Sequence, residues 1–199
     1  MLSVLLSMTI FALIGAITPG PVNVIATSTS ANFGFKRTLP HIIGASISYA
    51  MIVFIVGIGF NAVLKNHPQI TELLRYIGAA FLFYMAYKIA TSATSSESID
   101  STETPPRWLD GVLAQALNPK AWLVSMSGIT LFVTSQSPAS TYLVMFTLIS
   151  LFICLVGVGT WAAAGHLIYK LLSKPHHYVM LNRTMGLLLS VTVLLMLFT

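Results

Sequence analysis

Charged residues are scarce in this sequence: they make up 8% of its 199 residues, whereas 56% are hydrophobic. A soluble domain contains roughly 25% charged residues, so the composition excludes an ordinary soluble protein. One cysteine, Cys154, excludes an intramolecular disulfide framework. Lys and Arg outnumber Asp and Glu by 10 to 5, but they form no dense basic cluster, which argues against a nucleic-acid partner. The expected environment is the lipid bilayer.

Long uncharged runs take up most of the chain. A helix needs about 20 apolar residues to cross roughly 30 Å of hydrocarbon, and unbroken runs of this length favour helices over the short alternating strands of a barrel. The third run is the weakest, because Glu72 and Arg75 lie near its start as an expected interfacial ion pair. The sequence predicts an all-α integral membrane protein with six transmembrane helices, at residues 2–31, 39–64, 70–90, 109–133, 141–169 and 179–199.

The N-terminal segment is expected to stay in the protein, because residues 1–17 lack the basic residues that precede the apolar stretch of a signal peptide. Residues 92–107, rich in Ser, Thr and Glu, have the composition of a flexible linker. This linker separates two three-helix halves of one membrane domain, at residues 1–91 and 108–199.

Basic residues in short loops mark the cytoplasmic side of a membrane protein. If six spans alternate, the loops after the first, third and fifth spans are predicted to be cytoplasmic and both termini to be outside. That side then has Lys36, Arg37, Lys88, Arg107, Lys170, Lys174 and Arg183, against Lys65 and Arg75 on the other.

The two halves resemble each other in sequence at an offset of 100 residues. Three spans is an odd number, so the second copy is expected to enter the membrane upside down, as an inverted-topology repeat. Secondary transporters of this kind have their substrate site near the bilayer midplane, where discontinuous helices of the two repeats meet. The matched pairs are Pro19 with Pro119, Gly57 with Gly157, and Gly59 with Gly159, and, after an eight-residue longer loop, Arg75 with Arg183 and Gly78 with Gly186.

Proline interrupts the first span of each half, in Thr18-Pro19-Gly20-Pro21 and in Asn118-Pro119-Lys120. A proline within a helix frees backbone polar groups that hydrocarbon does not satisfy. The helix that restarts after Pro21 offers N–H groups and a positive dipole end to a carboxylate, and the carbonyls before it suit an ammonium. An amino acid has both charges. These two breaks are therefore predicted to frame a substrate site, with a packing kink as the alternative.

These motifs resemble the lysine exporter (LysE/RhtB) family over essentially the whole chain. The resemblance implies export of amino acids across the bacterial inner membrane, driven by proton motive force. The residues that carry it are Thr18-Pro19-Gly20-Pro21, Asn23, Gly34-Phe35-Lys36-Arg37, Gly44 and Asn118-Pro119-Lys120; residues 87–92 and Ala164-Gly165-His166-Leu167 are similar to the cysteine and O-acetylserine exporter branch.

No Asp or Glu lies in the middle of a predicted span. This absence disfavours a cationic substrate and favours a small neutral amino acid, with cysteine or O-acetylserine preferred. Exporters of other amino acids, of the homoserine, threonine or leucine type, are the alternative. His41 and His166 are expected near cytoplasmic helix ends, and as the best titratable candidates they are assigned a possible role in proton coupling; the alternative is an imidazole that only lies at the membrane interface.

Lys120 is the only basic residue predicted well inside a span, roughly 15 Å deep if the helix enters near Leu109. A charge at this depth is by default functional, so Lys120 is expected to hold the substrate carboxylate; the alternative is a lysine that snorkels to the interface. Asn23 and Asn118 flank the breaks, where they either cap the half-helices or bind substrate. The conspicuous glycines are expected to allow close helix approach: Gly44, Gly57, Gly59, Gly157 and Gly159.

Three rival functions lack support in the residues. An ion exporter would need several acids, cysteines or histidines within its spans, and an intramembrane enzyme needs a nucleophile with a base or a metal cluster at membrane depth. The pair His176-His177 has no supporting Cys or Asp, and Cys154 is expected to be an inert packing residue. No cofactor, metal or enzymatic activity is predicted, a structural subunit has no positive signature, and a homo-oligomer is left open.

Overall fold

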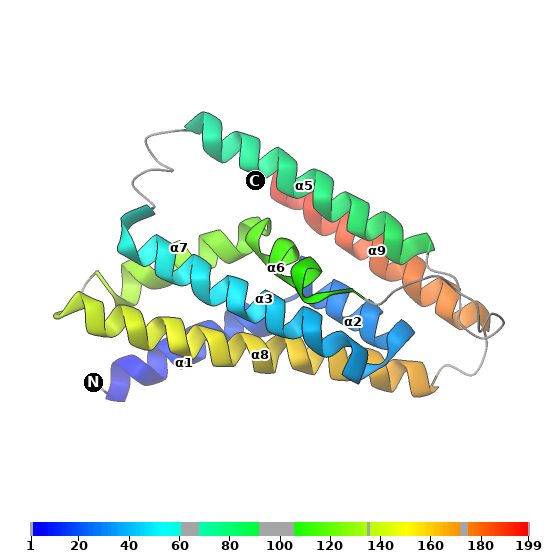
Figure 1. The fold of residues 1–199 in the computed structure, drawn as a ribbon, viewed down its shortest axis with the longest axis horizontal. Coiled ribbons are helices and arrows are strands. Elements are labelled where there is room, and N and C mark those ends of the chain that lie inside the picture. The colour runs from blue at the N-terminus through cyan, green and yellow to red at the C-terminus, as the bar shows by residue number, and fades with distance from the viewer. Residues whose placement is uncertain (1, 61–67, 92–105, 135, 172–174, 199) are drawn as a thin grey trace.

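The computed structural model describes residues 2–60, 68–91, 106–134, 136–171 and 175–198. Within these ranges every regular element is helical, as the sequence predicts (Figure 1). The expected linker lies almost entirely outside the described residues. The elements are α1 (Leu2–Ile17), α2 (Pro21–Phe33), α3 (Phe35–Ile55), the π-helical turn η1 (Val56–Phe60), α5 (Pro68–Thr91), α6 (Trp108–Ala116), α7 (Pro119–Phe132), α8 (Ala139–Leu171) and α9 (Pro175–Phe198).

The first predicted span is broken where its prolines predict a break. α1 ends at Ile17, α2 begins at Pro21, and the two helices are bent by 59°. Pro21 occupies the first position of α2, where its fixed φ fits the helix and its missing N–H removes no hydrogen bond. The fourth predicted span is also divided, because α6 ends at Ala116 and α7 begins at Pro119.

Within the described residues, two helical segments are each long and apolar enough to cross a bilayer, Phe35–Gly59 and Ala139–Ile168. The bent pair of α1 and α2 provides a third if it is counted as one span. Every other predicted segment is helical as well, including the weak third one, which forms the 24-residue helix α5. The helical class is therefore confirmed, and the count of six spans stays a prediction.

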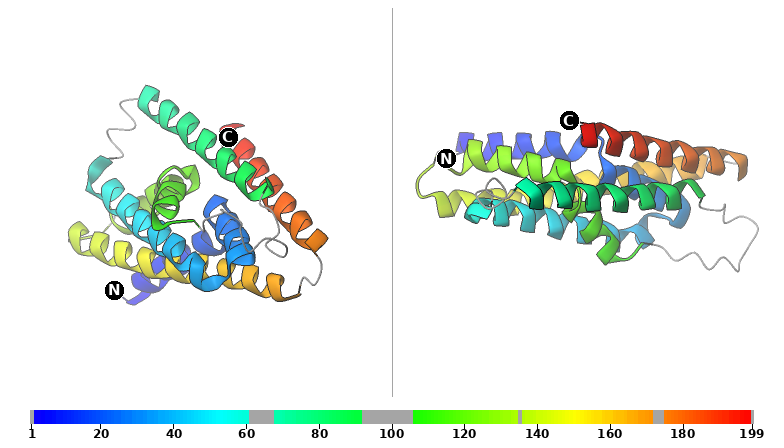
Figure 2. Two further views of the ribbon diagram at one scale, coloured as in Figure 1. Left: turned by 45° about the vertical axis from the view of Figure 1, so that its right-hand side comes forward. Right: turned by 90° about the horizontal axis from the view of Figure 1, so that it is seen from above.

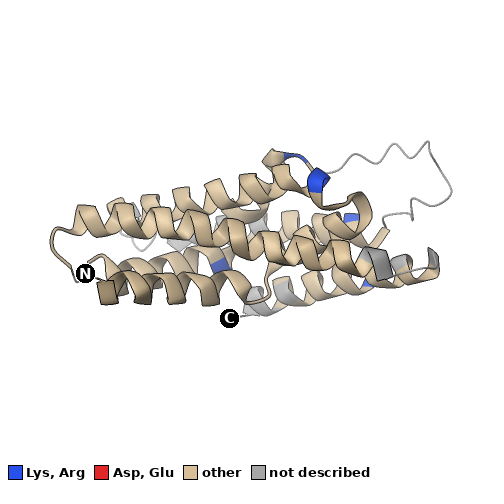
Figure 3. Cartoon of the chain, turned by 90° about the horizontal axis from the view of Figure 1, so that it is seen from below, with Lys and Arg blue, Asp and Glu red and all other residues tan. Residues whose placement is uncertain are grey.

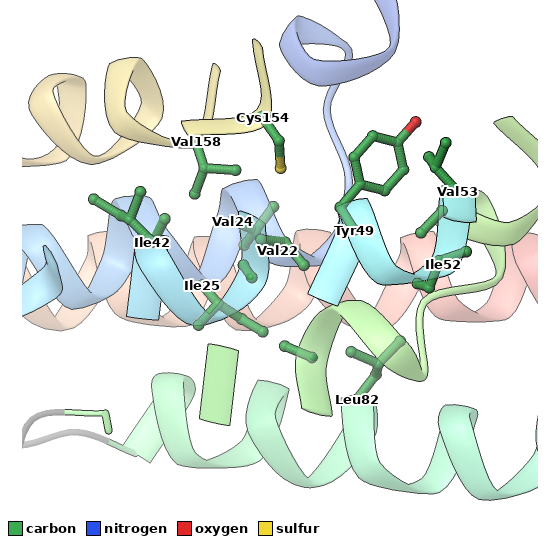
Figure 4. Packing of buried hydrophobic residues seen from close by; sticks show 14 of the residues in the cluster. Val22, Val24, Ile25, Ile42, Tyr49, Ile52, Val53, Leu82, Cys154 and Val158 are labelled. Atoms are coloured by element: carbon green, nitrogen blue, oxygen red, sulfur yellow. The ribbon is translucent and has the colours of Figure 1, made fainter. Parts of the chain in front are cut away.

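α2 lies at the centre of the bundle. All of its residues from Pro21 to Ala31 are buried, and it contacts α3, α8 and α9. α3 packs on α6 and α8, while α5 and α9 lie side by side along one flank (Figure 2). Apolar side chains from four helices meet around α2 (Figure 4): Val22, Val24 and Ile25 from α2, Ile42, Tyr49, Ile52 and Val53 from α3, Leu82 from α5, and Cys154 and Val158 from α8.

Gly34 lets the chain turn from α2 into α3. Its φ of 82° lies in the left-handed region, which favours glycine because it has no Cβ. Its N–H donates to the Ser30 carbonyl oxygen at 3.0 Å and so closes the last turn of α2. The turn directs α3 back along the bundle and brings Tyr49 toward the break between α1 and α2 (Figure 4).

Candidate functional site

Two side chains cap the carbonyl end of α1 at the first break. The Asn23 amide, in α2, donates to the carbonyl oxygens of Ala16 at 2.9 Å and Thr18 at 3.0 Å. The Trp161 indole, in α8, donates to the Ile17 carbonyl oxygen at 3.1 Å. Ile17 and Thr18 are exposed, so in a bilayer unpaired carbonyls here would meet hydrocarbon. These donors are what allows the helix to break at this depth.

Lys120 connects the second break to the first. Its Nζ donates to the Thr18 carbonyl oxygen at 2.7 Å and makes a longer contact of 3.4 Å with the Pro19 carbonyl oxygen. The side chain also covers Gly20, where an added Cβ would lie 3.3 Å from the Lys120 Cδ atom. From the sequence, these carbonyl oxygens are expected to bind a substrate ammonium. In the structure they bind the Lys120 ammonium of the chain itself. Lys120 is half-buried, and beyond these two contacts its ammonium has one further N–H group for a ligand.

Asn118 organises the second break. Its side-chain oxygen accepts from the Lys120 backbone N–H at 3.1 Å, which caps the start of α7, and its amide donates to the Gln115 side-chain oxygen at 3.3 Å. The Trp122 indole donates to the Ala116 carbonyl oxygen at 2.7 Å. Each break is therefore held by one asparagine and one tryptophan, although Asn23 serves a helix end and Asn118 a helix start.

Both breaks line a single cavity of about 40 Å³. This volume holds a few water molecules and is too small for an amino acid while the Lys120 side chain lies across it. The N-cap residue of α2 is Gly20, which provides no side-chain hydrogen bond to the helix, and Gly20, Val22 and Asn23 from this end line the cavity. Its other lining residues are Gly15, Ala16, Tyr49, Gln115, Asn118, Lys120, Ala121, Val124, Cys154 and Val158.

Three polar residues of the cavity were not among the sequence candidates: Tyr49, Gln115 and Cys154. Gln115 could have been found, since it lies one helical turn before Asn118 in a predicted span. Tyr49 and Cys154 gave no such signal, because an aromatic residue and a lone cysteine in apolar runs have the composition of a core. Both are buried, but they line the same cavity as the residues of the two breaks.

The two candidate histidines lie away from the cavity. His41 in α3 is fully buried, and its ring nitrogens have no hydrogen-bond partner among the described residues. α6 packs against it, since an added Cβ at Gly111 would overlap the His41 carbonyl oxygen. His166 is half-buried in α8. Neither histidine is among the residues that line the cavity beside Lys120.

The five candidate glycines have different surroundings. An added Cβ at Gly44 would overlap the Trp108 carbonyl oxygen, so α3 and α6 touch backbone to backbone there. Gly157 is close to Ala16 at the end of α1, and Gly57 faces the Leu143 side chain. Gly59 lies inside η1 with a φ of 104°, and neither Gly59 nor Gly159 has a described neighbour within 4 Å of an added Cβ.

Two further expectations concern an ion pair and a metal site. The Arg75 side chain lies outside it, so the expected pair with Glu72 is not described. The His176 and His177 rings lie 5.4 Å apart between centroids, and the described residues contain no group of three or more His, Cys, Asp or Glu side chains that could hold a metal.

The chain resembles known transporters over nearly its full length. Residues 13–198 match the family model described as LysE type translocator. The cysteine/O-acetylserine efflux protein of Salmonella typhi is 31% identical over 180 residues, which cover 90% of each chain. The protein of the same name from Escherichia coli O1:K1 / APEC is 32% identical over 162 residues, or 81% of this chain and 82% of the relative. No solved structure matches. The chain belongs to the LysE type translocator family and is a transporter rather than an enzyme.

Proposed function

We propose that this protein exports small neutral amino acids across the bacterial inner membrane, with cysteine or O-acetylserine as the favoured substrate. The observation that carries the proposal is the contact between the two helix breaks, where the Lys120 ammonium lies 2.7 Å from the Thr18 carbonyl oxygen beside a cavity that both breaks line. The names of the relatives, cysteine/O-acetylserine efflux proteins, support the choice of substrate.

Both charges of an amino acid have partners at these breaks. The substrate carboxylate binds the N-terminus of α2, where the dipole is positive and the N-cap residue Gly20 provides no side-chain hydrogen bond, together with the Lys120 ammonium. The substrate ammonium takes the carbonyl oxygens of Thr18 and Pro19. Lys120 releases these carbonyls as the substrate arrives. No Asp or Glu lines the cavity, so a cationic side chain would lack a counter-charge, which favours neutral substrates.

The transport cycle is alternating access by two inverted three-helix repeats. Corresponding helices of the two halves contact each other, α3 with α8 and α5 with α9, which supports an axis between the repeats. The two helix breaks, one before Pro21 and one before Pro119, also support this axis. Rocking of one half against the other would open the cavity first to one side and then to the other.

The orientation puts both termini outside the cytoplasm. Most of the described basic residues gather toward one end of the bundle, away from the N-terminus (Figure 3), and this end is the cytoplasmic one by the positive-inside rule. Residues 92–107 are then a cytoplasmic linker. Export is driven by proton motive force, with His41 and His166 as candidate proton carriers.

Counterflow in proteoliposomes tests this function. Vesicles preloaded with unlabelled O-acetylserine should take up labelled O-acetylserine, faster than they take up arginine, and the variant Lys120→Ala should lose this uptake. A panel that includes homoserine, threonine and leucine separates the alternative substrates. Absence of uptake for every neutral amino acid would overturn the function, whereas uptake that ignores an imposed pH gradient would remove proton coupling alone.

A further inference from the structure

We propose that Tyr49 and Cys154 form the subsite that receives the substrate side chain and limits its size. The inference rests on the proposed function, since it assigns the part of the amino acid that the helix breaks do not bind. Tyr49 comes from α3 and Cys154 from α8, and both line the cavity close to the segment that joins α1 to α2 (Figure 4). Among the described cavity residues of α3 and α8, these two have a side chain with an oxygen or sulfur atom.

The chemistry of this wall suits an uncharged side chain with an oxygen or sulfur atom. Tyr49 has a hydroxyl, Cys154 has a thiol, and Val158 from the next turn of α8 adds an apolar surface. The Ser125 side chain lies beside Tyr49 and the Ser46 side chain beside Cys154. Ser125 Oγ is buried, so the polar surface continues behind this wall.

The same wall sets a size limit. Tyr49 is 8% exposed, Cys154 4% and Val158 3%, so little space remains behind them. When Lys120 moves aside, the freed volume lies next to the breaks, and the side chain of the substrate must fit between α3 and α8. A thiol, a hydroxyl or a short ester fits there better than a long or branched chain.

Cys154 allows a direct test because it is the only cysteine in the chain. A small thiol reagent, methyl methanethiosulfonate, therefore modifies a single position in the unaltered protein. Saturating O-acetylserine, which has no thiol to consume the reagent, should slow this modification at least fivefold, whereas arginine should not. Modification that proceeds equally fast with and without O-acetylserine, or a Cys154 that never reacts in vesicles that transport, would overturn the subsite.

Enlarging the side chain tests the size limit. Cys154→Leu should reduce transport of O-acetylserine about tenfold or more relative to serine, because filling a small pocket discriminates strongly between substrates that differ by a few atoms. Val156→Leu is the matched control, since Val156 is on the same helix with 59% of its surface exposed and should leave the ratio unchanged.

The phenol is tested by Tyr49→Phe. Loss of one neutral hydrogen bond should lower the preference for O-acetylserine over 2-aminobutyrate, which lacks an acceptor in its side chain, roughly three- to tenfold. If the unaltered protein transports none of these amino acids, the proposed function fails. If it transports them and Cys154→Leu, Val156→Leu and Tyr49→Phe all keep its substrate ratios, only the subsite fails.

Discussion

At the scale of single residues, the first helix break is possible because other elements supply its hydrogen-bond donors. Asn23, Trp161 and Lys120 come from three different helices and pair with the last carbonyls of α1. In hydrocarbon each unpaired carbonyl would cost several kcal/mol. These side chains therefore contribute to folding as well as to the site, and a test of Lys120 must separate the two roles.

Replacing Lys120 by alanine should lower both stability and transport. The loss of a charged donor to Thr18 and Pro19 should destabilise the purified protein by about 1–3 kcal/mol, seen as a lower midpoint of thermal unfolding in detergent. Because the missing group is an ammonium, millimolar ethylammonium should restore part of the lost stability in Lys120→Ala and have no effect on the unaltered protein. Lys36→Ala, at an exposed position, is the control.

An equal response of both proteins to ethylammonium would contradict a specific ammonium site. The sequence singles out Lys120 as a candidate, because it is the one basic residue deep in an apolar segment. Its partner could not, since Thr18 is 102 residues away in the chain and contributes a backbone atom, which has no sequence signature.

At the scale of helices, backbone contact between α3 and α6 makes glycine necessary at residue 44. At residue 159, in α8, glycine is optional. Gly44→Ala should lower the thermal unfolding midpoint and the yield of folded protein, because the added Cβ would overlap the Trp108 carbonyl oxygen and overpacking typically costs about 1–3 kcal/mol. Gly159→Ala meets open space and should change little. Equal behaviour of the two variants in a melting experiment would count against close packing of α3 and α6.

A pair of asparagines ties α2 to α9. The Asn32 amide donates to the Asn182 side-chain oxygen at 2.8 Å, and the Asn182 amide donates back at 2.9 Å. Asn32→Ala and Asn182→Ala should each destabilise the protein, and the double variant should lose less than the sum, with a coupling energy of roughly 0.5–3 kcal/mol. Denaturation of the four proteins in one detergent measures this energy. Strict additivity would mean that the two side chains act independently.

The helices themselves could be predicted better than their contacts. The prolines at 19, 21 and 119 mark where helices end or begin, because proline acts on its own backbone. Gly44 and Gly159 look alike in the sequence, yet only one faces another backbone. Asn182 gave no signal, since an asparagine in an apolar segment is informative only once its partner is known.

At the scale of the whole molecule, the arrangement around α2 decides which residues share the site. Tyr49 and Cys154 are far apart in the chain and meet only because α3 and α8 both pack against the broken first span. Apolar periodicity predicts that a face is buried but does not name the helix that covers it. The distribution of basic residues is different, because it acts through the membrane and does not depend on which helices are neighbours. It therefore predicts the orientation of the chain in the membrane without a structure.

Reporter fusions test that orientation. Alkaline phosphatase, active only outside the cytoplasm, should be active when fused after residue 199, and green fluorescent protein fused there should be dark. Fusions at residue 98, in the polar stretch 92–107, should give the opposite pair of results. The physical reason is that basic loops resist translocation, and most of the described basic residues gather toward one end of the bundle (Figure 3). Replacing Lys36 and Arg37 by glutamine weakens this bias and should raise the fraction of inverted molecules. A fluorescent fusion after residue 199 in the unaltered chain would contradict an even number of spans with both termini outside.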